Sequence, residues 1–167
     1  IYDGGDPATT LQPTFTASRF GRNLLITSWF GNTVQIWNPR TKEVVEGHPD
    51  FAVPVNAIGF NGNMVVAELM TGSLVKRAPQ TMERVVLAEG FYVPSGLAAD
   101  RSGNLYVADW ASGIIWQVYV RGELQATPIP VAFDLVMPEG MAVDRRGRLL
   151  VVETGAQRLV RIDPHTG

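Results

Sequence analysis

Each of four regularly spaced prolines is followed within two residues by an oxygen-bearing side chain, and these side chains are the ones best suited to chemistry. They are Thr14, Asn56, Ser95 and Glu139. Carboxylate, amide and hydroxyl oxygens can bind hard cations such as calcium, and a carboxylate can also act as a base. Because Glu139 is the single carboxylate among them, the four side chains together would make a weak calcium site at best. The alternative is that these side chains hydrogen-bond the main chain of nearby loops.

A second set of polar side chains recurs where a strongly apolar segment ends. Its members are Ser28, Glu68, Asp109 and Glu153. Three carboxylates at one level could suggest catalysis, but a catalytic group is seldom needed once in every repeat. We therefore predict a structural role, in which these side chains hydrogen-bond neighbouring loops.

Other reactive or ligand-binding residue types are few. His48 and His165 lie in separate segments that we expect to be solvated outer turns, so neither a shared metal site nor a Ser-His-Asp triad is predicted. The sequence has no Cys, which excludes thiol chemistry and disulfides. Trp29 and Trp110 occupy equivalent positions, where they either cover an interface between sheets or stack on a ligand.

The composition indicates a folded chain rich in turns. Among 167 residues, 46% are hydrophobic and 18% charged, which excludes disorder, and 17 Gly with 11 Pro are too many for a helical bundle. The net charge of −2 and the scattered Lys and Arg predict no nucleic-acid binding. Apolar runs of about six residues are far shorter than a membrane span of roughly 20, so no membrane partner is expected. Since the first residue is Ile1, we expect a processed product or a piece of a longer reading frame.

The chain is built from an internal repeat. The segment from Pro94 to Trp110, PSGLAADRSGNLYVADW, aligns without a gap on the segment from Pro138 to Thr154, PEGMAVDRRGRLLVVET. The same frame begins at Pro13, and again at Pro54 with one residue deleted in a turn, so successive prolines are 40 to 44 residues apart. A period of this length made of short strands is typical of a β-propeller blade.

Each repeat predicts a four-stranded antiparallel blade. Small residues, as at 97–99, suit an inner strand beside a narrow axis, and a Gly-containing turn then leads into an apolar second strand. Second strands are expected at 24–27, 64–67, 105–108 and 149–152. Third strands are expected at 34–37, 74–77, 114–118 and 158–162, and outer strands at 42–46 and 83–88, with an irregular one around Pro128 and Pro130. No helix is expected.

The predicted fold class is therefore all-β, a β-propeller of four-stranded antiparallel blades with about four blades in this chain. The expected blades are 13–53, 54–93, 94–137 and 138–167, the last without its outer strand, while residues 1–12 form an outer strand of a preceding or closing blade. Two arrangements remain open. Either residues 1–12 complete the last blade and close a four-bladed ring, or the chain is a partial arc. An arc would leave open blade faces that a partner covers, or that join copies of the chain into a homo-oligomer.

The repeat resembles that of the regucalcin, gluconolactonase and senescence-marker-protein family, which is similar in turn to the NHL-repeat and strictosidine-synthase-like propellers. The motifs PSGLAADRSGNLYVAD from Pro94 and PEGMAVDRRGRLLVVETGAQRLVRIDPHTG from Pro138 carry the resemblance, which runs from Pro13 to Gly167. It implies a six-bladed type of propeller, of which this chain would be a part.

The resemblance also implies an axial divalent cation, calcium or zinc, whose bound water attacks a lactone. Glu139 in PEGM matches the acidic position of the family. Ser95 in PSG stands where the family has Asn, which weakens the site. Asn56 aligns with Gly96 rather than with Ser95, and the N-terminal Glu ligand of the family has no clear match.

Two functional hypotheses follow. The first is a metal-dependent hydrolase of the lactonase type, which acts on a small lactone or ester at the propeller axis. The residues expected in its site are Glu139 as catalytic group and metal ligand, Asn56 and Ser95 as further ligands, and Thr14, Trp29 and Trp110 as substrate contacts. The alternative is a non-enzymatic NHL-like propeller that serves as a protein-binding platform. Fold alone cannot choose between them.

Overall fold

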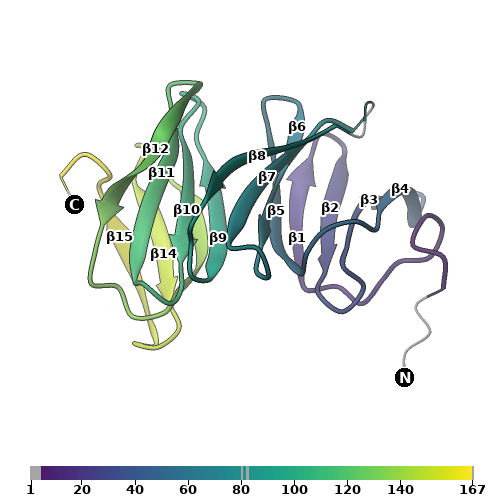
Figure 1. Cartoon of the computed structure of the whole chain (residues 1–167), viewed down its shortest axis with the longest axis horizontal. Helices are drawn as coiled ribbons and strands as arrows, with labels where there is room; N and C mark the ends of the chain where they lie inside the picture. The colour runs from purple at the N-terminus through teal and green to yellow at the C-terminus, as the bar shows by residue number, and fades with distance from the viewer. Residues whose placement is uncertain (1–4, 80, 82, 167) are drawn as a thin grey trace. The chain divides into compact units, whose positions relative to one another are not determined.

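The computed structural model describes residues 5–79, 81 and 83–166, which form strands and turns and no helix (Figure 1). The first sheet contains β1 (Thr16–Phe20), β2 (Asn23–Ser28), β3 (Thr33–Asn38) and β4 (Glu43–His48), and the second contains β5 (Pro54–Phe60), β6 (Asn63–Glu68), β7 (Ser73–Arg77) and β8 (Arg84–Glu89). The third contains β9 (Pro94–Ala99), β10 (Leu105–Asp109), β11 (Ile114–Val120) and β12 (Glu123–Ala132), and the fourth contains β13 (Pro138–Val143), β14 (Leu149–Glu153) and β15 (Arg158–Ile162). Within these residues no helix is long and apolar enough to cross a membrane.

Strands that follow one another in the chain are neighbours in each sheet, as in an antiparallel meander. Four such meanders in succession are the blades of a β-propeller. The predicted all-β propeller fold is therefore confirmed. We number the blades 1 to 4 in chain order.

The chain divides between Val85 and Val86, inside β8, into two compact units. The first unit holds blade 1 and strands β5 to β7 of blade 2, and the second holds blades 3 and 4. Within the first unit β1 lies beside β5, and within the second β9 lies beside β13. In each unit, therefore, the inner strands of successive blades are neighbours.

Glycine and aspartate make the hairpin that joins the first two strands of blades 3 and 4. Gly103 and Gly147 have φ of +84° and +79°, a region that residues with a side chain rarely occupy. Asp100 Oδ1 accepts the main-chain N–H groups of Ser102 and Asn104, both at 2.9 Å. These residue types explain why a D-x-x-G turn recurs in the repeat.

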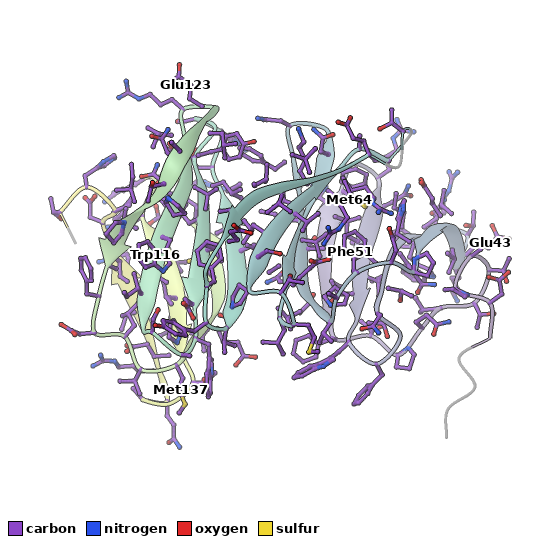
Figure 2. The ribbon with its side chains drawn as sticks, in the orientation of Figure 1. Glu43, Phe51, Met64, Trp116, Glu123 and Met137 are labelled. Atoms are coloured by element: carbon purple, nitrogen blue, oxygen red, sulfur yellow. The ribbon has the colours of Figure 1, made fainter. Side chains whose placement is uncertain are left out.

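The second strands are mostly buried, because each lies between the first and third strands of its own blade, although Val152 of β14 is exposed. In the first unit one core joins blades 1 and 2, and Figure 2 labels two of its members, Phe51 and Met64. The core consists of Leu25, Val34, Ile36, Phe51, Ala57, Met64, Val66 and Val75. A second core joins blades 3 and 4 and consists of Tyr106, Ala108, Ile115, Ala132, Leu149, Val151 and Ile162. Since each large apolar side chain contributes roughly 1.5–3 kcal/mol on burial, contacts between blades stabilise each unit.

The outer strand of blade 3 is longer and more regular than expected. It runs over ten residues and includes Pro128 and Pro130. The expected irregularity is limited to two shifts of register against β11. Because β12 is an edge strand, its prolines need not donate to a further strand.

The outer strand expected over residues 1–12 is absent from residues 5–12, and residues 1–4 lie outside the described residues. Asp6 instead starts a turn, in which its main-chain oxygen accepts the N–H groups of Thr9 and Thr10 at 3.0 and 2.8 Å. Its Oδ1 accepts the N–H of Ala8 at 2.9 Å. We call residues 5–12 the strap.

Candidate functional site

Ser95 lies half-buried near the start of β9, the inner strand of blade 3. Its Oγ is 2.8 Å from the main-chain oxygen of Pro138 and 3.1 Å from that of Ala108. A hydroxyl has one proton, so the two acceptors share it. The side chain therefore links the inner strand of blade 3 both to its own second strand and to the inner strand of blade 4.

Glu139 is exposed near the start of β13. Its main-chain oxygen lies against Gly96, where an added side chain would overlap it. The glycine thus lets the inner strands of blades 3 and 4 approach closely. The structure brings Ser95 and Glu139 onto adjacent strands of the second unit.

Thr14 and Asn56 belong to the first unit. Thr14 is exposed just before β1, and its Oγ1 lies 3.4 Å from the main-chain oxygen of Gln12. Asn56 is half-buried in β5, opposite Ala67 of β6. A common axial rim that gathers these two residues with Ser95 and Glu139 stays a prediction.

These four residues make a poor site for a divalent cation. Calcium takes six to eight oxygen ligands and favours carboxylates, whereas Glu139 is the sole carboxylate here. The Ser95 hydroxyl is already directed at two main-chain oxygens. No group of three His, Asp or Glu side chains in the described part of the chain could hold a metal ion. The residues present do not fit the ion that the family resemblance implies, and we derive no catalytic step from it.

The carboxylates that end the second strands hold loops, as predicted. Asp109 accepts the main-chain N–H groups of Val93 and Tyr92 at 2.9 and 3.0 Å. Glu68 accepts that of Ala52 at 3.1 Å, and Glu153 that of Val136 at 2.8 Å. In each case the loop is the one that leads into the inner strand of the same blade. The structural role is therefore confirmed for these three residues.

Glu68 and Glu153 also pair with Arg84 and Arg158, whereas Ser28 has a different role. The guanidinium of Arg158 hydrogen-bonds Glu153 and holds the pKa of this carboxyl below its usual value. Ser28 accepts the N–H of Gly31 at 3.2 Å, within its own turn. Blade 1 therefore has no carboxylate at this position to accept a main-chain N–H of the loop before its inner strand.

An aromatic cluster lies where β2 ends. The ring of Phe15 meets that of Trp29 edge to face, with centroids 5.2 Å apart and an interplanar angle of 85°. Phe30 stacks on Trp29 with centroids 6.5 Å apart and an angle of 21°. We call Phe15, Trp29 and Phe30 the aromatic patch, because all three are exposed. Sequence reasoning selected Trp29 alone, although Phe15 follows Thr14 directly.

Trp110 occupies the equivalent position in blade 3 and is half-buried. Its main-chain N–H donates to the oxygen of Val93 at 2.9 Å. No ring contact involving Trp110 is found in the described part of the chain. A role for Trp110 in binding a ligand stays a prediction.

The prediction that His48 is a solvated turn residue is wrong. His48 ends β4 and is fully buried, with Nε2 3.2 Å from Glu46 Oε1. Burial lowers the pKa of its imidazole. His165, in contrast, is exposed as expected.

Arg77 is another buried side chain that sequence reasoning missed. Its Nη1 donates to Asp50 Oδ1 at 2.7 Å, and Nη2 pairs with Oδ2. The guanidinium also lies 5.0 Å from the ring centroid of Phe51. A bidentate ion pair and a cation–π contact explain how Arg can be buried at the end of β7.

A groove of about 510 Å³ lies elsewhere, between the edge strands β8 and β12. Residues 86–89 and 126–128 line it. None of the predicted site residues is among them, so the groove is separate from the candidate site.

No family model and no curated protein matches the sequence. Solved structures do match. A structure from a nidogen/laminin complex has a TM-score of 0.77 at 19% identity and covers 87% of this chain and 57% of its own. Virginiamycin B lyase from Staphylococcus aureus has a TM-score of 0.74 at 12% identity, with coverage of 99% and 56%. A gluconolactonase-family protein has a TM-score of 0.68 at 16% identity, with coverage of 84% and 55%.

These structures share one fold. The chain is a β-propeller. Because the identities are below 20%, these matches show a shared fold and nothing finer. The shared fold agrees with the resemblance of the repeat motifs to gluconolactonase-type and NHL-type propellers. The chain spans just over half the length of each of the three structures. Since they include a lyase and a protein from an assembly, the fold leaves the function to be argued from the site.

Proposed function

We propose that the protein is a non-enzymatic β-propeller that binds an apolar segment of another protein or peptide at the aromatic patch. The observation that carries this proposal is the exposure of three rings, of which Trp29 contacts the other two. Phe15 is 45% exposed, Trp29 39% and Phe30 91%. Large apolar side chains that gather at the surface are characteristic of interaction sites.

The arrangement of the rings favours binding. Aromatic residues are enriched among those that dominate the energy of interfaces. Because Trp29 already contacts Phe15 and Phe30, its ring has less conformational freedom to lose when a partner covers it. The patch itself carries no charge, so the matching chemistry is a segment with exposed aliphatic or aromatic side chains.

The same end of blade 2 extends this apolar character. Met70 follows β6 as Phe30 follows β2, and it too is exposed. Leu69 stands in the position of Trp29. Apolar residues at the same end of two adjacent blades of one unit could contact a segment longer than a single side chain.

The axial residues support a hydrolase less well. Glu139 is the one carboxylate among them, and Ser95 is engaged with main-chain oxygens. Similarity to a gluconolactonase-family protein is matched by similarity to a structure from a nidogen/laminin complex, so the comparisons favour neither activity.

The test is a selection of random linear peptides displayed on phage against the whole chain, followed by measurement of the affinity of the enriched peptides. We expect peptides rich in aromatic and aliphatic residues, and a loss of affinity of at least about tenfold in Phe30→Ala and Trp29→Ala. Tyr92→Ala, which removes an exposed aromatic ring from the second unit, is the matched control and should bind normally. Peptides that bind all variants equally would contradict the proposal, as would hydrolysis of lactones that Glu139→Gln abolishes.

A further inference from the structure

The loop before the inner strand of blade 1 is held by an amide and not by a carboxylate. In blade 3, Asp109 accepts the main-chain N–H of Val93, the residue that precedes the first proline of the repeat. The equivalent residue of blade 1 is Gln12, and the position of Asp109 is taken by Ser28. The N–H of Gln12 donates to Gln35 Oε1 at 2.8 Å. Gln35 therefore replaces the missing carboxylate.

Gln35 stands at a position where no other blade has an amide. Its equivalents, each at the centre of a third strand, are Val75, Trp116 and Val160. None of these side chains can accept a hydrogen bond. Gln35 is fully buried, and its Nε2 donates to the oxygens of Pro7 and Thr10 at 2.7 and 2.8 Å. Its described hydrogen bonds all go to the strap, so the strap is what this buried amide holds.

A glycine gives the strap room to approach the sheet. Gly47 of β4 is the cross-strand partner of Gln35. A side chain at position 47 would overlap the main-chain oxygen of Pro7. The absence of a side chain at Gly47 therefore lets the main chain of the strap lie directly against β4. Both residues of this cross-strand pair are suited to the strap.

The strap continues into the aromatic patch. Pro13 and one further residue separate Gln12 from Phe15. A proline has a fixed φ and restricts the residue before it, so this short connection is stiff. The N–H of Phe15 donates to the oxygen of Thr27 in β2 at 2.8 Å. The main chain is therefore held on both sides of Pro13, by Gln35 on one side and by β2 on the other.

The strap also contacts the turn that carries the other two rings. The side-chain oxygen of Gln12 is 3.2 Å from the place that a Cβ at Gly31 would occupy. Gly31 directly follows Trp29 and Phe30 in the turn between β2 and β3. A displacement of Gln12 therefore affects Phe15 through the chain and Phe30 through the packing against Gly31.

We propose that the strap regulates the aromatic patch, so that the order of residues 5–12 and the binding of a partner segment favour each other. This inference rests on the proposed function. While Gln35 holds the strap, Phe15 and the turn after Trp29 are already in place, and less freedom is lost when the partner binds. Release of the strap adds the cost of ordering them, so the affinity falls. By linkage, a bound partner must stabilise the ordered strap by the same factor.

This reciprocal effect can be measured on the unaltered chain. The probe is the peptide of highest affinity from the phage selection, provided that Phe30→Ala weakens its binding. Saturation with this peptide should slow the hydrogen exchange of residues 5–12 at least about fivefold, the lower end of the usual range of coupling between two sites. Exchange in β10 is the internal reference and should not change.

Two variants release the strap in different ways. Gln35→Met removes the amide, and Gly47→Ala places a methyl group against the main chain of the strap. Each should accelerate the exchange of residues 5–12 and weaken binding of the peptide at least about fivefold. Gln125→Met and Gly140→Ala, both in the second unit, are the matched controls and should bind normally.

A double-mutant cycle separates positioning of the patch from a general loss of stability. If Gln35 acts on the peptide through Phe15, Gln35→Met should weaken binding less in a chain that already carries Phe15→Ala. A general loss of stability would weaken binding by the same factor in both backgrounds, which would overturn the proposal. The thermal transition of each variant shows that it is folded.

Failure of this proposal is distinguishable from failure of the proposed function. A selection that yields no peptide dependent on Phe30 overturns the proposed function, and the regulation falls with it. A peptide that needs Phe30 but leaves the exchange of residues 5–12 unchanged overturns the regulation alone. Full affinity in Gln35→Met and Gly47→Ala, when exchange shows that the strap is released, also overturns the regulation alone.

Discussion

A side chain at Gly96 would occupy the place of the Glu139 main-chain oxygen, whereas a side chain at Gly140 would meet Val152 alone among the described residues. The two glycines hold the same position in the repeat, in PSG and PEG. Their surroundings differ because the main chain of β13 lies against the first, whereas the side chain of Val152 lies near the second. The contact between Gly96 and Glu139 therefore shows that the inner strands of blades 3 and 4 approach too closely for a side chain at position 96.

Gly96→Ala should destabilise the chain by about 1–3 kcal/mol, because the methyl group forces the inner strands of blades 3 and 4 apart. Gly140→Ala is the matched control and should change the free energy of unfolding by less than about 0.5 kcal/mol. Urea denaturation measures both changes. Equal costs for the two substitutions would contradict this account.

Asp109→Ala should cost about 3 kcal/mol, because it leaves the N–H groups of Tyr92 and Val93 without their acceptor. Asp109→Asn keeps one acceptor oxygen, so its loss should be smaller. Glu123, an exposed residue at the start of β12 (Figure 2), provides the control Glu123→Ala, which should be neutral. If Asp109→Ala unfolds at the same urea concentration as Glu123→Ala, the loop is held by other contacts.

The strands could be predicted because the same pattern of apolar runs and glycine-containing turns occurs independently in each repeat. The apolar runs that gave β6 and β10 are buried on both sides, and the hairpin glycines have the positive φ that such turns require. The structural role of Asp109 and its equivalents also follows from recurrence. A feature present once in every blade serves the blade, and three carboxylates that hold three loops agree with this rule.

The features that sequence reasoning missed each occur once. His48 was expected in a solvated outer turn, but it ends β4 in a buried position, where Glu46 lies 3.2 Å away. The aromatic patch depends on Phe15, which stands where blade 3 has Gly96. The strap has no counterpart in the other repeats, so no periodic signal could reveal its bonds to Gln35. Residues that depart from the repeat have no periodic pattern to reveal their surroundings. Their burial and their partners depend on contacts with residues distant in sequence.

The stability of the chain should fall as the pH drops below about 6.5. Burial lowers the pKa of His48, so in this range the unfolded chain takes up a proton that the folded site resists. The slope from this one group is at most about 1.4 kcal/mol per pH unit, and Glu46, Asp50 and Arg77, which face the imidazole, modify it. Urea denaturation at several pH values should show a smaller slope in His48→Gln. His165→Gln, which removes an exposed imidazole, should leave the slope unchanged, and the idea fails if both variants behave alike.

Gln35→Met should release the strap from blade 1. The thioether has nearly the same length as the amide, but it cannot donate to the oxygens of Pro7 and Thr10, and it replaces the acceptor for the N–H of Gln12. Because buried hydrogen-bonding groups are costly to leave unpaired, residues 5–12 should exchange their amide hydrogens faster, by at least about tenfold, while β10 remains protected. Hydrogen exchange read by mass spectrometry resolves the two segments. Gln125→Met alters an amide whose described bond is to the main-chain oxygen of Glu123, and it should leave the strap protected. Unchanged exchange in Gln35→Met would mean that packing of the strap against Gly47, rather than the buried amide, holds it in place.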